Sequence, residues 1–375
     1  MSSLHDLSDL RICILGGGQL GWMTILEGRK YPLTFYVVDE PDAPACRIAD
    51  KCYDPRDYRY AVDSSDIVTF EFEHVHSDAL NYADERGKLL PRLSSVVLKR
   101  ERWLEKEFYR KHNIATPKFY IHDDLNEVIS TVKNEFNYYT VIKRSRGGYD
   151  GKGQYFIKSK EDLERCIDVL SKVKDVLIVE ELVDFDFEAS LIAVRNNSRF
   201  TNYPPTYNYN EGGILIYNYG PLAEDGIVKK MVEITKKISD TLNYVGVIGV
   251  EFFVKDDNVL VNEFAPRVHN TGHYTLDAAT TSQFEQHLRA ITGVELGDTS
   301  LLSYGGMVNI LGLSLSEVPL DVLRFGIIYW YHKKEVRKRR KMGHINIVGR
   351  DLRDVETKIS NVMGILYPNG VKPLI

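Results

Sequence analysis

The fold of this chain is decided by the stretch Val141-Ile142-Lys143-Arg144-Ser145-Arg146-Gly147-Gly148-Tyr149-Asp150-Gly151-Lys152-Gly153-Gln154. Two apolar residues lead into Lys143 at a predicted strand end, and four glycines follow it. Glycine has no Cβ, so such a loop can turn tightly and bring backbone N–H groups close to an anion. Lys143 and Lys152 add positive charge on both sides of the loop. The stretch therefore predicts a triphosphate-binding loop.

This loop differs from a Walker A loop. Lys152 is followed by Gly153 where that motif needs Ser or Thr, and the spacing from Gly147 to Gly151 is one residue too short. A glycine hairpin that binds nothing is the alternative for this stretch alone. The surrounding pattern predicts a small α/β module, with strands at 139–143, 154–157 and 175–180 and a helix at 160–172.

Composition describes an ordinary globular protein. The 375 residues, 27% of them charged and 43% hydrophobic, predict two or three domains. The net charge of −5 gives no overall field that favours nucleic acid or an anionic membrane. No apolar run approaches about 18 residues, and the N-terminus lacks a signal segment. Cys13, Cys46, Cys52 and Cys166 show no disulfide-like pattern, so we expect a reducing, cytoplasmic location.

The N-terminus predicts a βαβ unit. A strand at 10–15 leads into a Gly-x-Gly-x-x-Gly loop at 16–21 and a helix to about Lys30, and a second strand at 34–38 ends at Asp39. The loop is compatible with NAD, with another phosphorylated ligand or with a purely structural turn. A third strand at 67–70 runs into Glu71 and Glu73, and a helix is expected over 98–112, with Arg102 and Lys106 on one face.

Two carboxylates lie in a predicted hairpin with strands at 245–254 and 258–264. If the connecting loop has an odd number of residues, Glu251 and Glu263 face each other, and a cation between them removes their repulsion. A loop of even length places Asn262 opposite Glu251 instead. Mg²⁺ favours one or two carboxylates together with substrate phosphates, so either register predicts a metal–nucleotide site.

Three further segments are candidate sites. Glu180 and Glu181 follow a strand and suit an adenine amino group and ribose hydroxyls, or form a solvated loop. Arg267 to His273 combines Arg, His and Asn beside the hairpin, which indicates anion binding and proton handling, although a single His is more often structural. The basic run 333–341 holds seven Lys or Arg residues and suits closure over a phosphate, a nucleic-acid patch or a solvated face.

Together these segments resemble the 5-(carboxyamino)imidazole ribonucleotide synthase family of ATP-grasp enzymes, which act in purine biosynthesis. The resemblance covers nearly the whole chain and is most specific at 147–154, 262–273 and 281–287. It implies an α/β (α+β) ATP-grasp fold. The implied parts are a Rossmann-like domain over 1–97, an ATP-grasp domain over 98–300 with a lid at about 116–185, and a small β-rich domain over 301–375.

The resemblance also implies the reaction and its residues. ATP would drive carboxylation of aminoimidazole ribonucleotide by bicarbonate in a homodimer, with Mg²⁺ (or Mn²⁺) on Glu251 and Glu263. The implied ATP contacts are Arg102, Lys143, Gly148, Tyr149, Asp150, Gly151, Lys152, Gly153, Gln154, Glu180, Glu181, Leu182, Val183, Glu188, Asn210, Asn262 and Glu263. The implied substrate contacts are Gly18, Gln19, Leu20, Glu73, Tyr149, Arg267, His269, Lys333 and Arg340, of which Glu73, Tyr149, Arg267 and His269 are also the expected catalytic residues.

Some alternatives stay open at this level. Glu71 competes with Glu73 for the substrate, and Lys341 competes with Arg340. The chain has Asn210 where bacterial members often have His, and Lys338-Arg339 where Pro-Gly is common. Another ATP-grasp carboxylase or formate-dependent purine ligase is the near alternative for function, and an NAD-binding oxidoreductase is the remote one.

Overall fold

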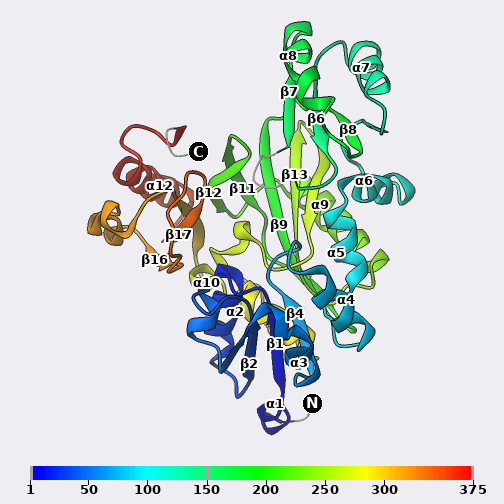
Figure 1. The fold of residues 1–375 in the computed structure, drawn as a ribbon. Helices are drawn as coiled ribbons and strands as arrows, with labels where there is room; N and C mark the ends of the chain where they lie inside the picture. The colour runs from blue at the N-terminus through cyan, green and yellow to red at the C-terminus, as the bar shows by residue number, and fades with distance from the viewer. Residues whose placement is uncertain (1–2, 148–152, 373–375) are drawn as a thin grey trace.

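The computed structural model describes residues 3–147 and 153–372, which form three β-sheets with helices packed against them (Figure 1). The N-terminal sheet has the parallel order β3-β2-β1-β4. This is the predicted Rossmann-like unit. Its strands are β1 (Arg11–Leu15), β2 (Thr34–Val38), β3 (Lys51–Tyr53) and β4 (Ile67–Phe70), and its helices are α1 (His5–Ser8), α2 (Gln19–Gly28), α3 (Tyr58–Asp63) and α4 (Ser77–Glu85).

A small four-stranded sheet of order β5-β8-β6-β7 lies within the segment expected to be a lid, and that role stays a prediction. Helices α7 and α8 cover one face, and their apolar residues share a core of their own with Ile142 and Val179. Its elements are β5 (Phe119–His122), α7 (Leu125–Asn134), β6 (Thr140–Arg144), β7 (Gln154–Ile157), α8 (Lys160–Leu170) and β8 (Leu177–Glu181). In Figure 1 this module projects from one end of the molecule.

The largest sheet has nine strands in the order β14-β13-β9-β11-β12-β15-β17-β16, with β10 paired to β9. Because β15 pairs with β12, the sheet runs without interruption across residue 300. The proposed division of the chain at 97/98 and 300/301 stays a prediction. The strands are β9 (Phe187–Arg195), β10 (Phe200–Asn202), β11 (Thr206–Glu211), β12 (Ile214–Gly220), β13 (Gly246–Lys255), β14 (Asn258–Ala265), β15 (Tyr304–Leu311), β16 (Ile327–Trp330) and β17 (Lys341–Gly349).

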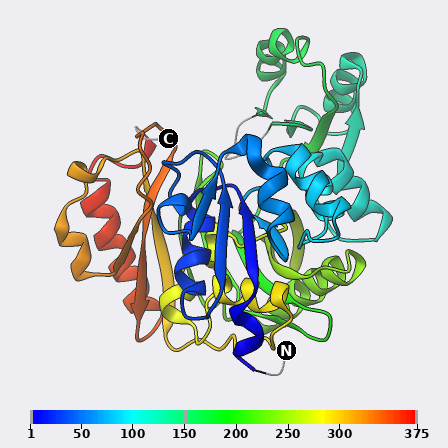
Figure 2. The same cartoon turned by 60° about the horizontal axis from the view of Figure 1, so that its bottom comes forward.

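One helix, α11 (Gln283–Thr292), joins the N-terminal part to the large sheet (Figure 2). Leu288 and Ile291 on this helix pack with Ile12 and Phe35, while Phe284 packs with Val247 of β13. Since burial of this apolar surface stabilises the contact, the N-terminal sheet is held beside the large sheet. Three further helices are α9 (Asp225–Thr241), α10 (Thr275–Ala278) and α12 (Leu352–Leu366).

The helix expected over 98–112 is wrong as a single element. The chain forms α5 (Leu93–Arg100) and α6 (Arg102–Lys111), and Glu101 between them leaves the helical conformation (φ −112°, ψ 89°). At the break the chain contacts the segment before the glycine loop: Glu101 pairs with Arg146 at 2.6 Å, and Arg102 N donates to Ser145 O at 3.2 Å. The sequence pattern hides this break because apolar residues recur at helical spacing on both sides.

The expectation of no disulfide is also wrong. Cys46 and Cys52 are paired, with their Cα atoms 5.2 Å apart, while Cys13 and Cys166 are free. A short 3₁₀ helix at Ala45–Arg47 folds the connection back toward β3 and brings the two residues together. In the described parts of the chain, no helix is both long and apolar enough to cross a bilayer.

Candidate active site

The two candidate metal ligands face one another on β13 and β14: Glu251 pairs directly with Glu263. The two-residue turn at 256–257 would place Asn262 opposite Glu251 in an unbroken ladder. The register shifts by one residue between Glu251 and Phe252, and this β-bulge brings Glu263 opposite Glu251. The carboxylates therefore face each other although the turn has an even length, and the expectation that an even-length turn places Asn262 opposite Glu251 is wrong because it did not allow for the bulge.

The two carboxyl groups have opposite electrostatic environments. Burial, and then the charge of Glu263, raise the pKa of Glu251 to about 8. Burial also opposes ionisation of Glu263, but the charges of Lys99 and Arg102 outweigh it and lower the pKa of that carboxyl. Lys99 Nζ lies 2.7 Å from Glu263 Oε2, and Arg102 Nη2 lies 3.9 Å from it.

The donor set fits a hard divalent cation. Mg²⁺ takes oxygen ligands and commonly binds through one or two carboxylates plus substrate phosphates. Glu251 and Glu263 supply such oxygens, and the Glu263 side chain keeps 34% of its surface exposed, which leaves an approach for an ion and a phosphate. Among the described residues, no group of three or more His, Cys, Asp or Glu gathers as a metal site, so the remaining ligands would come from substrate and water.

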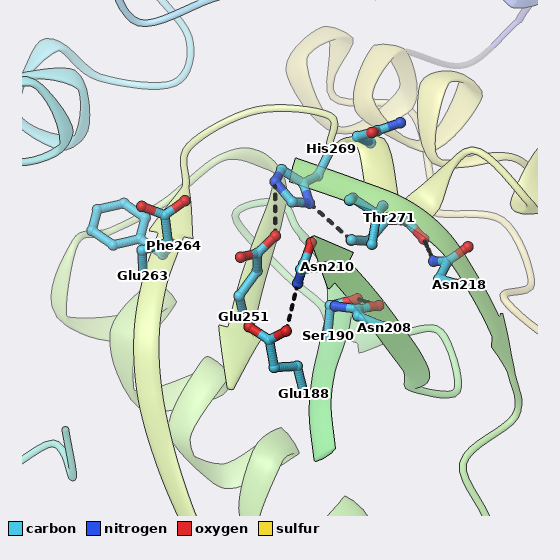
Figure 3. Close-up of polar contacts among 12 residues, drawn as sticks. Glu188, Ser190, Asn208, Asn210, Asn218, Glu251, Glu263, Phe264, His269 and Thr271 are labelled. Carbon is cyan, nitrogen blue, oxygen red and sulfur yellow. Dashed lines mark hydrogen bonds and ion pairs between the residues drawn. The ribbon is translucent and has the colours of Figure 1, made fainter. Parts of the chain in front are cut away.

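His269 lies beside this pair (Figure 3). Its Nε2 is 3.7 Å from Glu251 Oε1, and its Nδ1 is 2.8 Å from Thr271 Oγ1. A Cβ at Gly249 would come within 2.7 Å of His269 Cβ, so the absence of a side chain there lets the histidine lie against β13. Burial, and then the charge of Arg267, lower the pKa of His269 to about 3. The imidazole is therefore neutral at physiological pH and offers one donor and one acceptor.

Arg267 and Glu73 connect the hairpin to the N-terminal part. Arg267 Nε lies 3.0 Å from Glu73 Oε1, and Glu73 is only 2% exposed. Neither of these two atoms makes an aligned hydrogen bond within the described residues. The pair is therefore held by charge, and both groups keep hydrogen-bonding capacity for a ligand.

The Glu71 side chain points toward the first glycine loop, away from Arg267 and the hairpin. Its carboxylate accepts from Gly18 N at 2.7 Å and from Gly21 N at 3.1 Å, and Asp39 accepts from Gly17 N at 2.6 Å. These amides lie at the start of α2, where a helix N-terminus favours negative charge. The chain's own carboxylates thus occupy the amides to which a dinucleotide phosphate would bind. Of the two glutamates, Glu73 faces the candidate site.

Near that loop, Gln19 begins α2 and Leu20 is buried in the core shared with α11. The expected substrate contacts at Gly18, Gln19 and Leu20 stay predictions.

A buried charge cluster lies between the lid and α6. Lys143 Nζ donates to Glu180 Oε2 at 2.9 Å, and Lys106 Nζ lies 3.3 Å from the same oxygen. Lys143 pairs across the sheet with Ile178, so Glu180, two residues further on, shares its face. Burial disfavours the charged carboxylate, but Lys106 and Lys143 outweigh that effect and lower the pKa of Glu180 to about 2.

Glu188 and Asn210, both expected to contact ATP, lie together on β9 and β11. Asn210 Nδ2 donates to Glu188 Oε2 at 2.9 Å (Figure 3). Burial raises the pKa of Glu188, and the charge of Glu188 in turn contributes to raising the pKa of Glu251. The Asn210–Glu188 pair therefore lies next to β13, the strand that carries Glu251.

Other expected ATP contacts lie at strand ends. Gly153 directly precedes β7, which begins at Gln154, and Lys143 pairs with Gln154. Glu181 ends β8, and Leu182 and Val183 follow it. Gly148, Tyr149, Asp150, Gly151 and Lys152 lie outside the described residues.

The basic run makes several contacts within the protein. Lys333 Nζ donates to Lys341 O at 2.7 Å, Arg340 Nη1 to Glu335 O at 3.0 Å, and Arg339 Nη2 to Gly212 O at 2.8 Å. These contacts form the turn that leads into β17, which Lys341 begins. The choice between Arg340 and Lys341 as a substrate ligand stays open.

Three family models match successive parts of the chain: the ribonucleotide synthetase preATP-grasp domain over 10–99, the ATP-grasp domain over 107–284, and the phosphoribosylaminoimidazole carboxylase C-terminal domain over 306–358. The chain is 59% identical to the N5-carboxyaminoimidazole ribonucleotide synthase of Saccharolobus solfataricus, over 96% of this chain and 97% of that protein. It belongs to the N5-carboxyaminoimidazole ribonucleotide synthase family. The expected ATP-grasp fold and ligase class are confirmed.

Solved structures of the family agree with this assignment. The Thermus thermophilus N5-carboxyaminoimidazole ribonucleotide synthetase superposes with a TM-score of 0.87 at 33% identity, covering 95% of this chain and 98% of that one. The Aspergillus clavatus synthase, in complex with ADP and 5-aminoimidazole ribonucleotide, gives a TM-score of 0.87 at 26% identity, covering 96% and 99%.

Two residues that lie in the candidate site, Lys106 and Lys99, are not among the site residues predicted from the sequence. Lys106 is visible in the sequence only as a neighbour of Arg102 on one helix face, with nothing to indicate its contact with Glu180. Lys99 follows Val97 and Leu98 without any motif around it. Its approach to Glu263, 164 residues away, depends on how α5 packs against the hairpin.

Proposed function

We propose that this chain carboxylates 5-aminoimidazole ribonucleotide with bicarbonate, converting ATP to ADP and phosphate through carboxyphosphate. One observation carries the proposal: the facing carboxylates Glu251 and Glu263 adjoin His269, and Arg267 in the same segment reaches Glu73 of the N-terminal part. The segment from Arg267 to His269 thus contacts both a candidate metal–phosphate site, through His269, and a candidate substrate site, through Arg267.

The first step is transfer of the γ-phosphoryl group to bicarbonate. A bicarbonate oxygen attacks the γ-phosphorus, the bond to the β-phosphate oxygen breaks, and ADP leaves. Such transfer depends mainly on positioning and on neutralising charge. Lys143 and Arg102 would supply positive charge to the phosphates, and Glu251 and Glu263 would hold Mg²⁺, which supplies further neutralisation when bound.

The second step joins carbon to nitrogen. The exocyclic amine of the ribonucleotide attacks the carbonyl carbon of carboxyphosphate, the carbon–oxygen bond to phosphate breaks, and the departing phosphate takes the proton that the amine loses. If carboxyphosphate first breaks down to CO₂ and phosphate in the site, the amine adds to that CO₂ and gives its proton to the phosphate already released. Arg267 offers a planar fork that matches a carboxylate or phosphate. Neutral His269 would hydrogen-bond the bicarbonate oxygens, with its orientation set by Thr271. The Glu73 carboxylate, which lies 3.0 Å from Arg267, would accept a hydrogen bond from the amine.

The assembly and location implied by the family resemblance are also part of the proposal. A homodimer and a cytoplasmic location stay predictions, and size-exclusion chromatography with light scattering would test the first. Mn²⁺ as a substitute for Mg²⁺ is tested by metal replacement in the assay below.

The decisive experiment measures ADP, phosphate and carboxylated ribonucleotide in one assay. ADP release should require Mg²⁺ and rise when aminoimidazole ribonucleotide and bicarbonate are both present. Stimulation by formate with a different ribonucleotide, or by free biotin, would instead support another ATP-grasp ligase. Binding of NADH in place of ATP would support the oxidoreductase alternative.

A further inference from the structure

Lys106 is a second buried lysine on the carboxylate that pairs with Lys143. It lies on α6 and is 1% exposed, and its Nζ is 3.3 Å from Glu180 Oε2 and 3.0 Å from Thr116 Oγ1. Glu180 is likewise 1% exposed. One carboxylate oxygen therefore has two lysines, which approach it from a helix and from the lid sheet.

The arrangement poses a problem for nucleotide binding. In the described structure Lys143 donates to Glu180, so a phosphate oxygen has to compete with that carboxylate for the ammonium group. The other oxygen of the carboxylate, Oε1, makes no hydrogen bond within the described residues. With Lys143 gone and no other cation near, Glu180 would be a buried charge without a partner, which is strongly unfavourable.

We propose that Lys106 is a positioning residue for nucleotide binding: it keeps the Glu180 carboxylate paired, so that Lys143 can move to the phosphates of ATP. Lys106 suits this task because it is anchored. Thr116, to which it donates, itself donates to Val261 O at 2.8 Å, so α6 and β14 fix the lysine in place. Lys143 stands at the end of β6, close to where the glycine loop begins. The inference rests on the proposed role of Lys143 at the phosphates.

The test is calorimetric titration of Mg·ATP, without bicarbonate or ribonucleotide, into wild type and Lys106→Met. Methionine keeps an unbranched chain beside the rings of Tyr109 and Phe119 that Lys106 contacts. We expect ATP to bind at least about tenfold more weakly, as for loss of one charge-assisted contact. Lys111→Met, an exposed change on the same helix, is the matched control and should leave the affinity unchanged.

Combined variants distinguish the proposed positioning role of Lys106 from a purely structural one. In a Lys143→Met background the lysine proposed to bind the phosphates is absent, so adding Lys106→Met should weaken ATP binding no further. An undiminished effect in that background would overturn the inference, as would wild-type affinity in folded Lys106→Met.

If Lys106→Met does not fold, the pair Lys106→Met/Glu180→Gln removes both charges and is compared with Glu180→Gln alone. Equal ATP affinity of these two proteins supports the inference, and a further loss in the double variant overturns it. Failure of wild type to bind Mg·ATP would overturn the proposed function together with this inference. Normal wild-type binding with an unaffected Lys106→Met would overturn the inference alone.

Discussion

Glu251 and Glu263 stand opposite one another because a β-bulge lies between Glu251 and the turn of their hairpin. Without the bulge, Glu251 would pair with Asn262, whose side chain is an uncharged amide. The bulge thus turns an ordinary hairpin into a pair of facing carboxylates suited to a divalent cation.

Removing the charge of Glu263 should weaken metal binding. Glu263→Gln keeps the size of the side chain but leaves one carboxylate, so the Mg²⁺ concentration for half-maximal ADP release should rise at least about tenfold, as for loss of a charge-assisted contact. Asp257→Asn, in the exposed turn of the same hairpin, is the control and should behave as wild type. An unchanged Mg²⁺ titration in Glu263→Gln would mean that this residue only supports the hairpin.

Metal binding should depend on pH through Glu251. Burial and the charge of Glu263 raise the pKa of Glu251 to about 8, so its carboxyl group is mostly protonated at pH 7 and must lose the proton to bind Mg²⁺. Affinity should therefore increase as pH rises toward 8 and level off above it, by up to roughly tenfold per pH unit for one released proton. Calorimetric titrations of Mg²⁺ in buffers of different ionisation enthalpy would measure the number of protons released on binding. The dependence should disappear in Glu251→Gln; if it persists there, another group is responsible.

Loss of His269 should separate ATP hydrolysis from carboxylation. The neutral imidazole lies 3.7 Å from Glu251 and is held by Thr271, at the proposed reacting centre. His269→Ala should reduce carboxylation by about 10²–10⁴-fold with much less effect on ATP affinity, and the remaining ADP release should exceed product. ADP and carboxylated product are measured in the same samples. Tightly coupled, near-normal turnover in both His269→Ala and Arg267→Ala would place the reacting centre elsewhere.

The disulfide should be detectable chemically. Titration of thiols in denaturant should find two without reductant, from Cys13 and Cys166, and four after reduction. Opening a short closed loop of this kind costs about 2 kcal/mol of stability, so Cys46→Ser should unfold at a lower temperature. Cys166→Ser leaves the disulfide intact, so its unfolding temperature should stay close to that of the wild type. Four reactive thiols before reduction would show that the two cysteines are unpaired in solution.

Much of the local structure follows from local sequence. The strands β1, β2 and β4, the hairpin of β13 and β14, and the strands on either side of 147–154 are close to their predicted positions. Each has an apolar run bounded by glycine or polar turn residues, and those signals lie within the element itself. The glycine loops are visible for the same reason.

Other features depend on residues far apart in the chain. At the break, Glu101 contacts Arg146, 45 residues away, and Glu71 accepts a hydrogen bond from Gly18 of the first glycine loop, 53 residues away. Lys106 and Lys99 become site residues only once α6 and α5 pack against Glu180 and Glu263.

Local sequence therefore predicts several of the strands, the glycine loops and the types of residue available for chemistry, because periodicity and turn propensity act between neighbours along the chain. The tertiary structure decided which carboxylate faces which cation and which register the hairpin adopts. Those choices depend on packing, burial and charge between segments that no local pattern connects.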